Sequence, residues 1–180
     1  MLYLIPGVFI FHLCTVIVMH LVYKMLVPCL PESHLNKLLF LVRNCFPYAY
    51  DLSIHDLRAF NYAIVAQQEG QFVGVLFVQT QIRHPDPADY TPPETEHNIH
   101  YLCVLERFRR DNIASELLQC CKTDSAADTE PGTIARLRVS FPARLFLTDD
   151  TRQRLIAFFE RHDFSIQGEI EGGGVHMLML

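Results

Sequence analysis

Residues 102–118 read LCVLERFRRDNIASELL and join an apolar run to a helix-like run through a basic turn. Residues 102–105 are typical of a buried strand, and residues 112–122 have the apolar spacing of a helix. A strand that leads into a helix points several unpaired backbone N–H groups in one direction, which favours an anion. Arg109 and Arg110 can add charge-assisted hydrogen bonds. The segment therefore indicates a phosphate site or, as the alternative, a solvated basic turn.

The composition fits one domain with its own core. The chain has 180 residues, half of them hydrophobic, and a net charge of −5. This charge argues against a nucleic-acid binder, which would carry a basic excess. The six cysteines lie mostly in apolar runs, without a Cys-x-x-Cys pair or a zinc-like His/Cys spacing. We interpret them as reduced thiols, and we expect no metal site.

The first 23 residues differ from the rest of the chain. They contain no charged side chain if His12 and His20 are neutral, and the length of the stretch suits a bilayer core. We interpret residues 1–23 as a single transmembrane helix that anchors a domain of residues 24–180. The alternative is a buried N-terminal helix or hairpin. Positive charge follows the stretch, at Lys24 and Lys37, and none precedes it, which predicts a domain on the cytosolic side.

The remaining sequence alternates between strand-like and helix-like runs. The patterns predict, in order, a strand in 23–30, a helix in 31–46, a short helix or an irregular turn in 51–60, a hairpin in 62–82, a loop in 83–96, a strand in 97–105, a helix in 112–122, a loop in 123–133, a strand in 134–141, a helix in 149–164 and strands in 165–170 and 174–180. The predicted order is β-α-α-β-β-β-α-β-α-β-β. Such an order favours an α/β domain with a mixed sheet.

Five motifs in this order resemble those of one enzyme superfamily. Residues 109–114, RRDNIA, are similar to its Arg/Gln-x-x-Gly-x-Gly/Ala signature, which follows the fourth strand. The other four are FPYAY at 46–50, FVGVLF at 72–77, AFFERHDF at 157–164 and GVHMLML at 174–180. From about residue 24 to residue 180 the chain resembles the GCN5-related N-acetyltransferase (GNAT) superfamily. Within it, the likeness is to the Golgi-associated type of N-terminal acetyltransferase.

This resemblance implies a fold, a substrate and a set of site residues. The fold is a mixed, mostly antiparallel central sheet in which two parallel strands splay apart, flanked by helices, and acetyl-CoA is the acetyl donor. The implied cofactor-binding residues are Leu102, Cys103 and Val104 for the pantetheine arm, Arg109, Arg110, Asp111, Asn112, Ile113, Ala114 and Ser115 for the pyrophosphate, and Phe159 near the thiol. The implied acceptor loop holds Phe46, Pro47, Tyr48 and Tyr50. The two tyrosines grip a peptide or, alternatively, cap the core.

Several positions depart from the family pattern. Asn112 replaces a glycine; asparagine tolerates a left-handed backbone, but its side chain can crowd the pyrophosphate. Asn98 and Arg138 fall where the family has its catalytic tyrosine and histidine, and neither is a base near neutral pH. Phe159 falls where a tyrosine would protonate the departing thiolate.

His100 is the candidate for the missing base. Alternation along a strand puts its side chain on the same face as Asn98 and puts Tyr101 on the other face. Histidine has a suitable intrinsic pKa for general-base catalysis, directly or through a water. The alternative is a histidine that only packs. The nearby charged run at 94–97 is expected to be a solvated loop.

These observations lead to two hypotheses of different kinds. The first is an acetyl-CoA-dependent N-acetyltransferase acting on the α-amino group of a protein or peptide N-terminus, with a degenerate catalytic site. A lysine or a small amine is an alternative acceptor. The second hypothesis is a membrane-tethered, catalytically weakened relative that binds the cofactor or a partner.

Overall fold

The observed order of elements is the order that the sequence predicts. The computed structural model describes residues 20–46, 49, 51–84, 92–127, 133–141, 149–170 and 174–179. The elements are β1 (Leu21–Leu26), η1 (Val27–Cys29), α1 (Glu32–Cys45), α2 (Ile54–Leu57), β2 (Tyr62–Gln68), β3 (Gln71–Arg83), β4 (Glu94–Val104), η3 (Glu106–Phe108), α3 (Ile113–Ala127), β5 (Ile134–Phe141), α4 (Asp149–Glu160), β6 (Ser165–Ile170) and β7 (Gly174–Met179). The predicted α/β class is confirmed.

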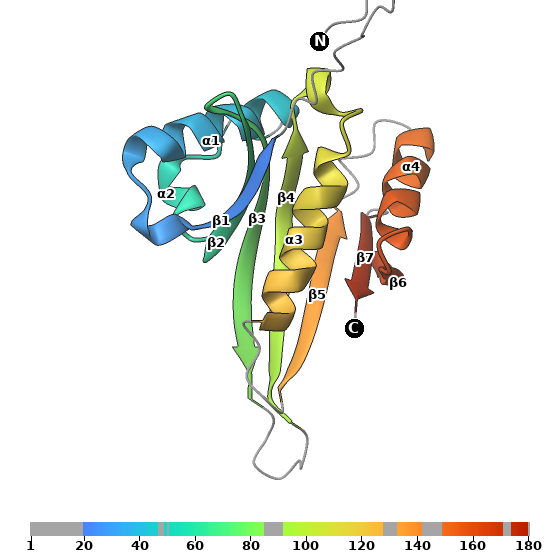
Figure 1. Ribbon diagram of the computed structural model, residues 1–180. Coiled ribbons are helices and arrows are strands. Elements are labelled where there is room, and N and C mark those ends of the chain that lie inside the picture. The colour runs from blue at the N-terminus through green and yellow to red at the C-terminus, as the bar shows by residue number, and fades with distance from the viewer. Residues whose placement is uncertain are drawn as a thin grey trace, which may run out of the picture.

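The strands form one seven-stranded sheet in the order β1-β2-β3-β4-β5-β7-β6. Only β4 and β5 are parallel, and every other neighbouring pair is antiparallel. Helices α3 and α4 pack on one face of the sheet, and α1 and α2 cover β1–β4 on the other (Figure 1). We call these the α3 face and the α1 face. Each face buries its own apolar core.

Hydrophobic spacing explains how α1 docks. Leu35, Leu38, Leu39 and Val42 lie on one side of the helix and are buried, as the sequence spacing predicts. Pro31 stands immediately before the helix, where the loss of its N–H has no cost.

The ends of several elements differ from the prediction. β1 begins at Leu21, so the last three residues of the expected 1–23 anchor belong to the sheet, and residues 1–19 lie outside the described residues. None of the helices in the described ranges has the length and apolar character needed to cross a membrane. α3 continues to Ala127, and β4 begins at Glu94, so both expected loops are shorter.

Gly74 allows α3 to approach the sheet closely. A Cβ atom at this position of β3 would lie 3.0 Å from Ile113 Cγ2, 3.1 Å from Leu117 Cδ1 and 3.2 Å from the Cys103 carbonyl oxygen. These neighbours belong to the first turns of α3 and to β4, so there is no free space for a methyl group. The glycine thereby sets the position of the α3 start against β4.

The first prediction concerns this contact. Gly74→Ala should lower the free energy of unfolding by about 1–3 kcal/mol, because an added methyl group in a packed core forces its neighbours to shift. Urea denaturation measures the change. Gly168→Ala, in β6, is the matched control, because a Cβ there meets nothing within 4 Å, and its effect should be much smaller. Equal stability of the two variants would contradict the close approach.

Candidate functional site

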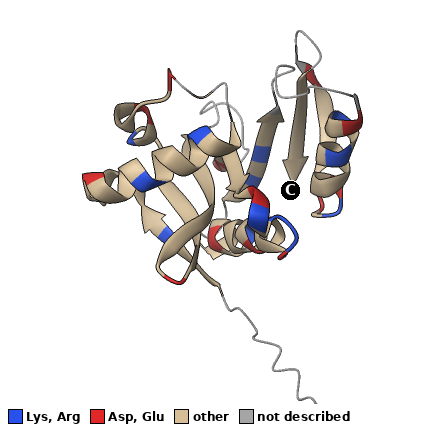
Figure 2. Cartoon of the chain, turned by 90° about the horizontal axis from the view of Figure 1, so that it is seen from above, with Lys and Arg blue, Asp and Glu red and all other residues tan. Residues whose placement is uncertain are grey.

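β4 and β5 run side by side over only part of their lengths. Their register runs from Glu94 opposite Ile134 to Ile99 opposite Val139. Beyond this point β5 pairs with β7, and in the described part of the chain residues 101–104 of β4 pair with β3 alone. Seen from above, the sheet halves diverge (Figure 2). The splayed parallel strands implied by the resemblance are therefore present; we call the point where they part the split.

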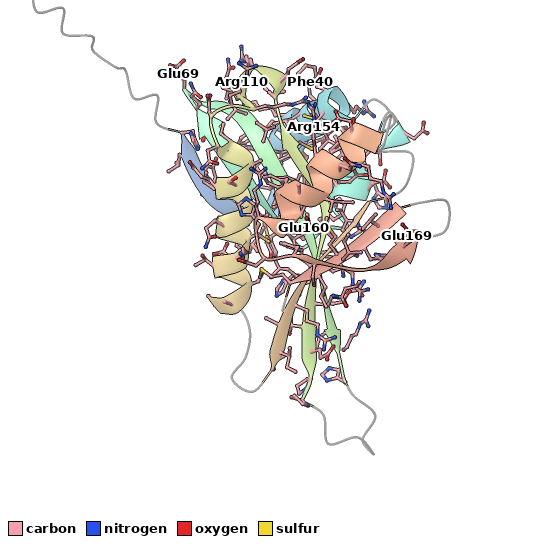
Figure 3. All side chains as sticks on the ribbon, turned by 90° about the vertical axis from the view of Figure 1, so that its right-hand side faces the viewer. Phe40, Glu69, Arg110, Arg154, Glu160 and Glu169 are labelled. Carbon is pink, nitrogen blue, oxygen red and sulfur yellow. The ribbon has the colours of Figure 1, made fainter. Side chains whose placement is uncertain are left out.

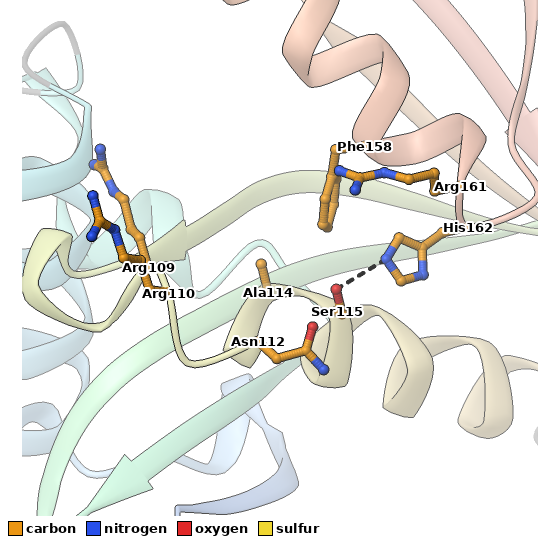
Figure 4. Close-up of a pocket in the computed structure, with 8 residues that line it drawn as sticks. All are labelled: Arg109, Arg110, Asn112, Ala114, Ser115, Phe158, Arg161 and His162. Carbon is orange, nitrogen blue, oxygen red and sulfur yellow. Dashed lines mark hydrogen bonds between the residues drawn. The ribbon is translucent and has the colours of Figure 1, made fainter.

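A pocket of about 490 Å³ lies where α3 begins. The turn before α3 and the first residues of this helix contribute Arg109, Arg110, Asn112, Ala114 and Ser115 to the pocket wall. Helix α4 contributes Phe158, and the residues just after it contribute Arg161 and His162. Figure 4 shows Arg109 and Arg110 on one side of the pocket and Phe158 and Arg161 on the other. Three guanidinium groups and the unpaired N–H groups of the first helical turn thus surround one space. This is a strongly anion-attracting environment.

Three hydrogen bonds hold the end of α4 against α3. His162 Nε2 and Ser115 Oγ are 3.1 Å apart. Lys122 Nζ donates to the His162 carbonyl at 3.1 Å and to Asp163 Oδ2 at 2.7 Å. Burial lowers the pKa of His162, and the charges of Lys122 and Arg161 lower it further. His162 is therefore neutral at pH 7 and can share a hydrogen bond with the Ser115 hydroxyl.

Asn112 has the conformation that the sequence suggested. Its φ is +61°, in the left-handed region, so asparagine performs the backbone role of the family's glycine. Its carboxamide points along the first turn of α3, away from Arg109 and Arg110 (Figure 4). The side chain lines the pocket without closing it.

Not every predicted cofactor residue lines this pocket. Asp111 is exposed, and Ile113 is buried in the core of the α3 face. Phe159 is only 1% exposed and packs edge-on against Phe158 and Phe164. Of the α4 residues, Phe158 rather than Phe159 lines this basic pocket; the expected place of Phe159 near the thiol stays a prediction.

The free edge of β4 carries the three residues predicted for the pantetheine arm. Leu102 and Val104 contact the core of the α3 face, and Cys103 is buried on the α1 face. Arg109 Nε donates to the Val104 carbonyl at 3.3 Å. This bond ties the basic turn to the end of the strand.

A pair of thiols lies behind this strand end. Cys45 Sγ donates to the Val104 carbonyl at 3.5 Å. A hydrogen bond from Cys103 and the nearby guanidinium of Arg109 lower the pKa of Cys45 to about 7. Burial raises the pKa of Cys103 well above its ordinary value. Cys45 is thus the more nucleophilic of the two thiols at neutral pH.

His100 lies at a bulge in β4. Val78 is opposite Ile99 and Phe77 is opposite Tyr101, so His100 is the additional residue. Its ring centroid is 5.1 Å from that of Phe60, on the α1 face. His97 and Ile99 face α3, so Asn98 faces the α1 side, and the prediction that His100 and Asn98 share a face is confirmed.

The bulge overturns one detail of that prediction. Tyr101 does not face away from His100, because its ring also lies against Phe60, at 6.0 Å. Strict alternation fails where one strand holds an additional residue. His100 is exposed, with its ring against Phe60, and partial burial of the imidazole lowers the pKa of His100. A neutral imidazole at this position can accept a proton.

Of the predicted acceptor loop, the structure describes Phe46 but not Pro47, Tyr48 or Tyr50. The Phe46 ring lies 5.7 Å from the Tyr101 ring. Phe46 is thus connected through Tyr101 and Phe60 to the bulge at His100. The start of the FPYAY loop therefore lies on the α1 face beside the split.

Arg138 and Asn98 are register partners in the last pair but one before the split. Arg138 Nη2 lies 3.3 Å from Glu96 Oε2, and Arg83 Nη2 lies 3.2 Å from the same oxygen. The Glu96 side chain is only 3% exposed. The expectation of a solvated loop at 94–97 was wrong for Glu96, and also for His97, whose Nδ1 lies 3.2 Å from Thr80 Oγ1 in the interior.

A second histidine lies near the split and was not singled out in the sequence. Ser140 is the first β5 residue past the last β4 pair, and its cross-strand neighbour is His176 of β7. Their side chains are hydrogen bonded, with 2.7 Å between Ser140 Oγ and His176 Nδ1. No local motif marks this pair, because only the strand order β5-β7 brings the two residues together.

The residues present fit acetyl-CoA. The guanidinium groups and helix-start amides suit a diphosphate, and past Ile99 the β5 side of β4 has no strand partner in the described ranges, which leaves room for an amide-rich arm. When bound, this donor would supply an activated acetyl thioester. The cofactor residues that the structure brings together at the pocket are Arg109, Arg110, Asn112, Ala114 and Ser115.

Comparison with known proteins agrees with this arrangement. The sequence model of the Acetyltransferase (GNAT) family matches residues 19–164. Acetyl-CoA is the donor that the acetyltransferases of this family use. No relative is found among curated proteins.

Three solved structures illustrate the shared fold. ElaA of Escherichia coli has a TM-score of 0.61 and 15% identity, covering 90% of this chain and 100% of that chain. Naa50 of Arabidopsis thaliana, in complex with the bisubstrate analogue CoA-Ac-MVNAL, has a TM-score of 0.55 and 15% identity, with coverages of 87% and 96%. An aminoglycoside 6′-N-acetyltransferase complexed with coenzyme A has a TM-score of 0.61 and 15% identity, with coverages of 88% and 95%. At these identities the likeness shows the fold alone.

The second prediction tests the helix start. Asn112→Val should lower the free energy of unfolding by about 1–2 kcal/mol, because a β-branched residue is strained at positive φ, and it should weaken acetyl-CoA binding. Asn112→Gly is the matched variant; it tolerates the same φ and should bind acetyl-CoA at least as tightly as the wild type. Denaturation and calorimetric titration measure both effects. Weaker binding by the glycine variant would show that the carboxamide, not the backbone conformation, serves the ligand.

Proposed function

Because the chain belongs to the GNAT family of acetyltransferases, we propose that it transfers the acetyl group of acetyl-CoA to the α-amino group of a protein or peptide N-terminus. One observation carries this proposal: three features follow one another along β4. They are the basic pocket at the start of α3, the free edge of β4 and the split. A donor whose diphosphate is held at α3 would have its thioester directed along β4 toward the split.

His100 is proposed as the general base. An ammonium group cannot attack a thioester, so the acceptor must lose a proton, and His100 is on the α1 face just past the last β4–β5 pair. Its lowered pKa keeps it unprotonated at pH 7. The proton passes to the imidazole directly or through a water. Phe159 is buried and has no proton to give to the departing thiolate.

The α1 face near the split is proposed as the acceptor side. Phe46 of the FPYAY loop contacts Tyr101 at the bulge, which supports a loop that receives the first residues of a peptide. The likeness to Naa50 in complex with a bisubstrate peptide analogue is compatible with a peptide acceptor. A lysine side chain or a small amine is the alternative, since an aminoglycoside acetyltransferase shares the fold with a TM-score of 0.61, against 0.55 for Naa50.

A second function is favoured by the positions of Asn98 and Arg138. The family's tyrosine and histidine are replaced by an amide and by a guanidinium that is ion-paired with Glu96. A protein with these replacements can bind acetyl-CoA or a peptide without rapid turnover. Released thiol, measured with acetyl-CoA and a panel of peptides with free N-termini, separates the two functions. Acetyl-CoA binding without thiol release from any peptide or amine would support the binding module.

The third prediction concerns His100. His100→Ala should lower kcat by about 10²–10³-fold, within the usual range for losing a general base, while acetyl-CoA affinity remains unchanged. Because the pKa of His100 is lowered, wild-type activity should persist at pH 6.5 and decline only at more acidic pH, where the imidazole becomes protonated. His55→Ala, at an exposed position on α2, is the control and should have wild-type activity. An unchanged kcat in His100→Ala at saturating substrates would remove His100 from the mechanism.

We also propose that the N-terminal stretch anchors the domain to a membrane, with the domain in the cytosol. Residues 1–19 carry no charged side chain if His12 is neutral, and His20, which follows them, is hydrogen bonded to Glu116 of α3 and belongs to the domain. About 20 residues suffice for a helix that spans a bilayer core.

The fourth prediction tests this anchor. The full-length chain should remain in the membrane fraction after an alkaline carbonate wash, whereas a variant that lacks residues 1–19 and keeps β1 should be released. A C-terminal tag should be cleaved by protease added on the cytosolic side. Recovery of the full-length chain in the soluble fraction would contradict the proposal.

A further inference from the structure

The lower parts of β3, β4 and β5 form an extension of the sheet that carries an unusual set of charges. These strand ends extend past the helices (Figures 1 and 3), and Figure 3 shows nitrogen- and oxygen-tipped side chains along them. On the α1 face lie three arginines and two glutamates: Arg83, Arg136, Arg138, Glu94 and Glu96. One positive charge is left over among these residues.

The register explains why these side chains share a face. Leu137 and Val139 of β5 belong to the core of the α3 face, so Arg136 and Arg138 point to the opposite side. In a parallel pair, register partners share a face, and Glu96 is the partner of Arg136. The cluster therefore lies on the same face as His100 and Phe46.

Glu96 is a support rather than a ligand-binding group. Its side chain is only 3% exposed, so an acceptor cannot reach it. Two guanidinium groups contact the same carboxylate oxygen, at 3.2 Å from Arg83 and 3.3 Å from Arg138. A buried carboxylate needs such partners, because removing it from water without compensation is costly. The contact also fixes the Arg138 side chain in one orientation.

Arg138 has binding capacity beyond this contact. A guanidinium has five N–H donors, and its planar fork matches a carboxylate. The Arg138 side chain remains 34% exposed although one nitrogen contacts Glu96. It lies one register pair from the split, whereas Arg136 lies further from the split and contacts Glu94 at 2.8 Å. Arg138 is thus the cation of this cluster nearest to the proposed position of the acceptor amine.

We infer that Arg138, oriented by Glu96, binds a carboxylate of the acceptor, so that the preferred substrates are amines with a carboxylate a few bonds away. This inference rests on the proposed acetyltransfer at the split and specifies its acceptor. Strand residues rise about 3.3 Å each. An amine at the level of His100 and a carboxylate at Arg138 are therefore separated by about the length of one or two strand residues. Free α-amino acids and N-termini that begin with Asp or Glu have this chemistry. Polycationic acceptors are disfavoured by the surplus positive charge.

The fifth prediction compares acidic and amide acceptors. Short C-terminally amidated peptides that begin with Asp or Glu should have kcat/KM values about 10- to 100-fold higher than those that begin with Asn or Gln, the range expected for a hydrogen bond to a charged group. Arg138→Gln should remove this preference. Arg136→Gln is the matched control, with a similarly exposed arginine on the same strand, and should keep it. Free glutamate and aspartate, assayed beside the peptides, distinguish an amino-acid acceptor from a peptide acceptor.

Two further measurements keep the inference testable. If Arg138→Gln folds poorly because Glu96 loses a partner, the double variant Arg138→Gln/Glu96→Gln removes both charges and should fold while lacking the acidic preference. Titration of the same peptides onto the CoA-saturated protein needs no turnover, and acidic peptides should bind at least about tenfold more tightly. Equal binding of acidic and amide peptides, or loss of the preference in Arg136→Gln as well, would overturn the inference. If acidic peptides bind preferentially but no acetyl transfer is detected, the proposed enzymatic function is rejected instead.

Discussion

β4 and β5 exchange backbone hydrogen bonds as far as Ile99 and Val139, and the candidate site is arranged around their parting. Below this point the two strands are ordinary parallel neighbours. Above it β5 is bound by β7, and among the described strands β4 retains only β3. An unpaired strand edge inside a protein must obtain hydrogen bonds elsewhere. Water or an amide-rich ligand can supply them beside the start of α3.

The second organising feature is the distribution of positive charge around that edge. At the upper end, the turn before α3 and the end of α4 bring three arginines to the helix start, where the backbone dipole already favours an anion. At the lower end, Arg138 lies near the split with Glu96 as its support. The acidic net charge of the chain does not contradict either site, since both are local. A donor with a diphosphate and an acceptor with a carboxylate would meet between them.

Local sequence patterns were sufficient for the order of elements and for the backbone of the helix start. Asn112 was expected to tolerate a left-handed conformation, and it has one. That Phe158 lines the basic pocket while Phe159 is buried could not be predicted from the sequence, because adjacent helical residues differ by about 100° in direction and the orientation of the helix depends on packing. The bulge at His100 was also hidden, since it arises from the pairing of β3 with β4. Glu96 was assigned to solvent because its partners Arg83 and Arg138 come from other strands.

The most direct test of this account is a calorimetric titration with S-acetyl-pantetheine beside S-acetyl-dephospho-CoA. The two ligands share the acetylated arm, and the second adds the diphosphate together with the adenosine attached to it; the diphosphate is the group expected over the amides at the start of α3. The account predicts that acetyl-dephospho-CoA binds at least about 100-fold more tightly, since several charge-assisted hydrogen bonds depend on that group. Equal affinities would contradict the assignment of the basic pocket to the diphosphate.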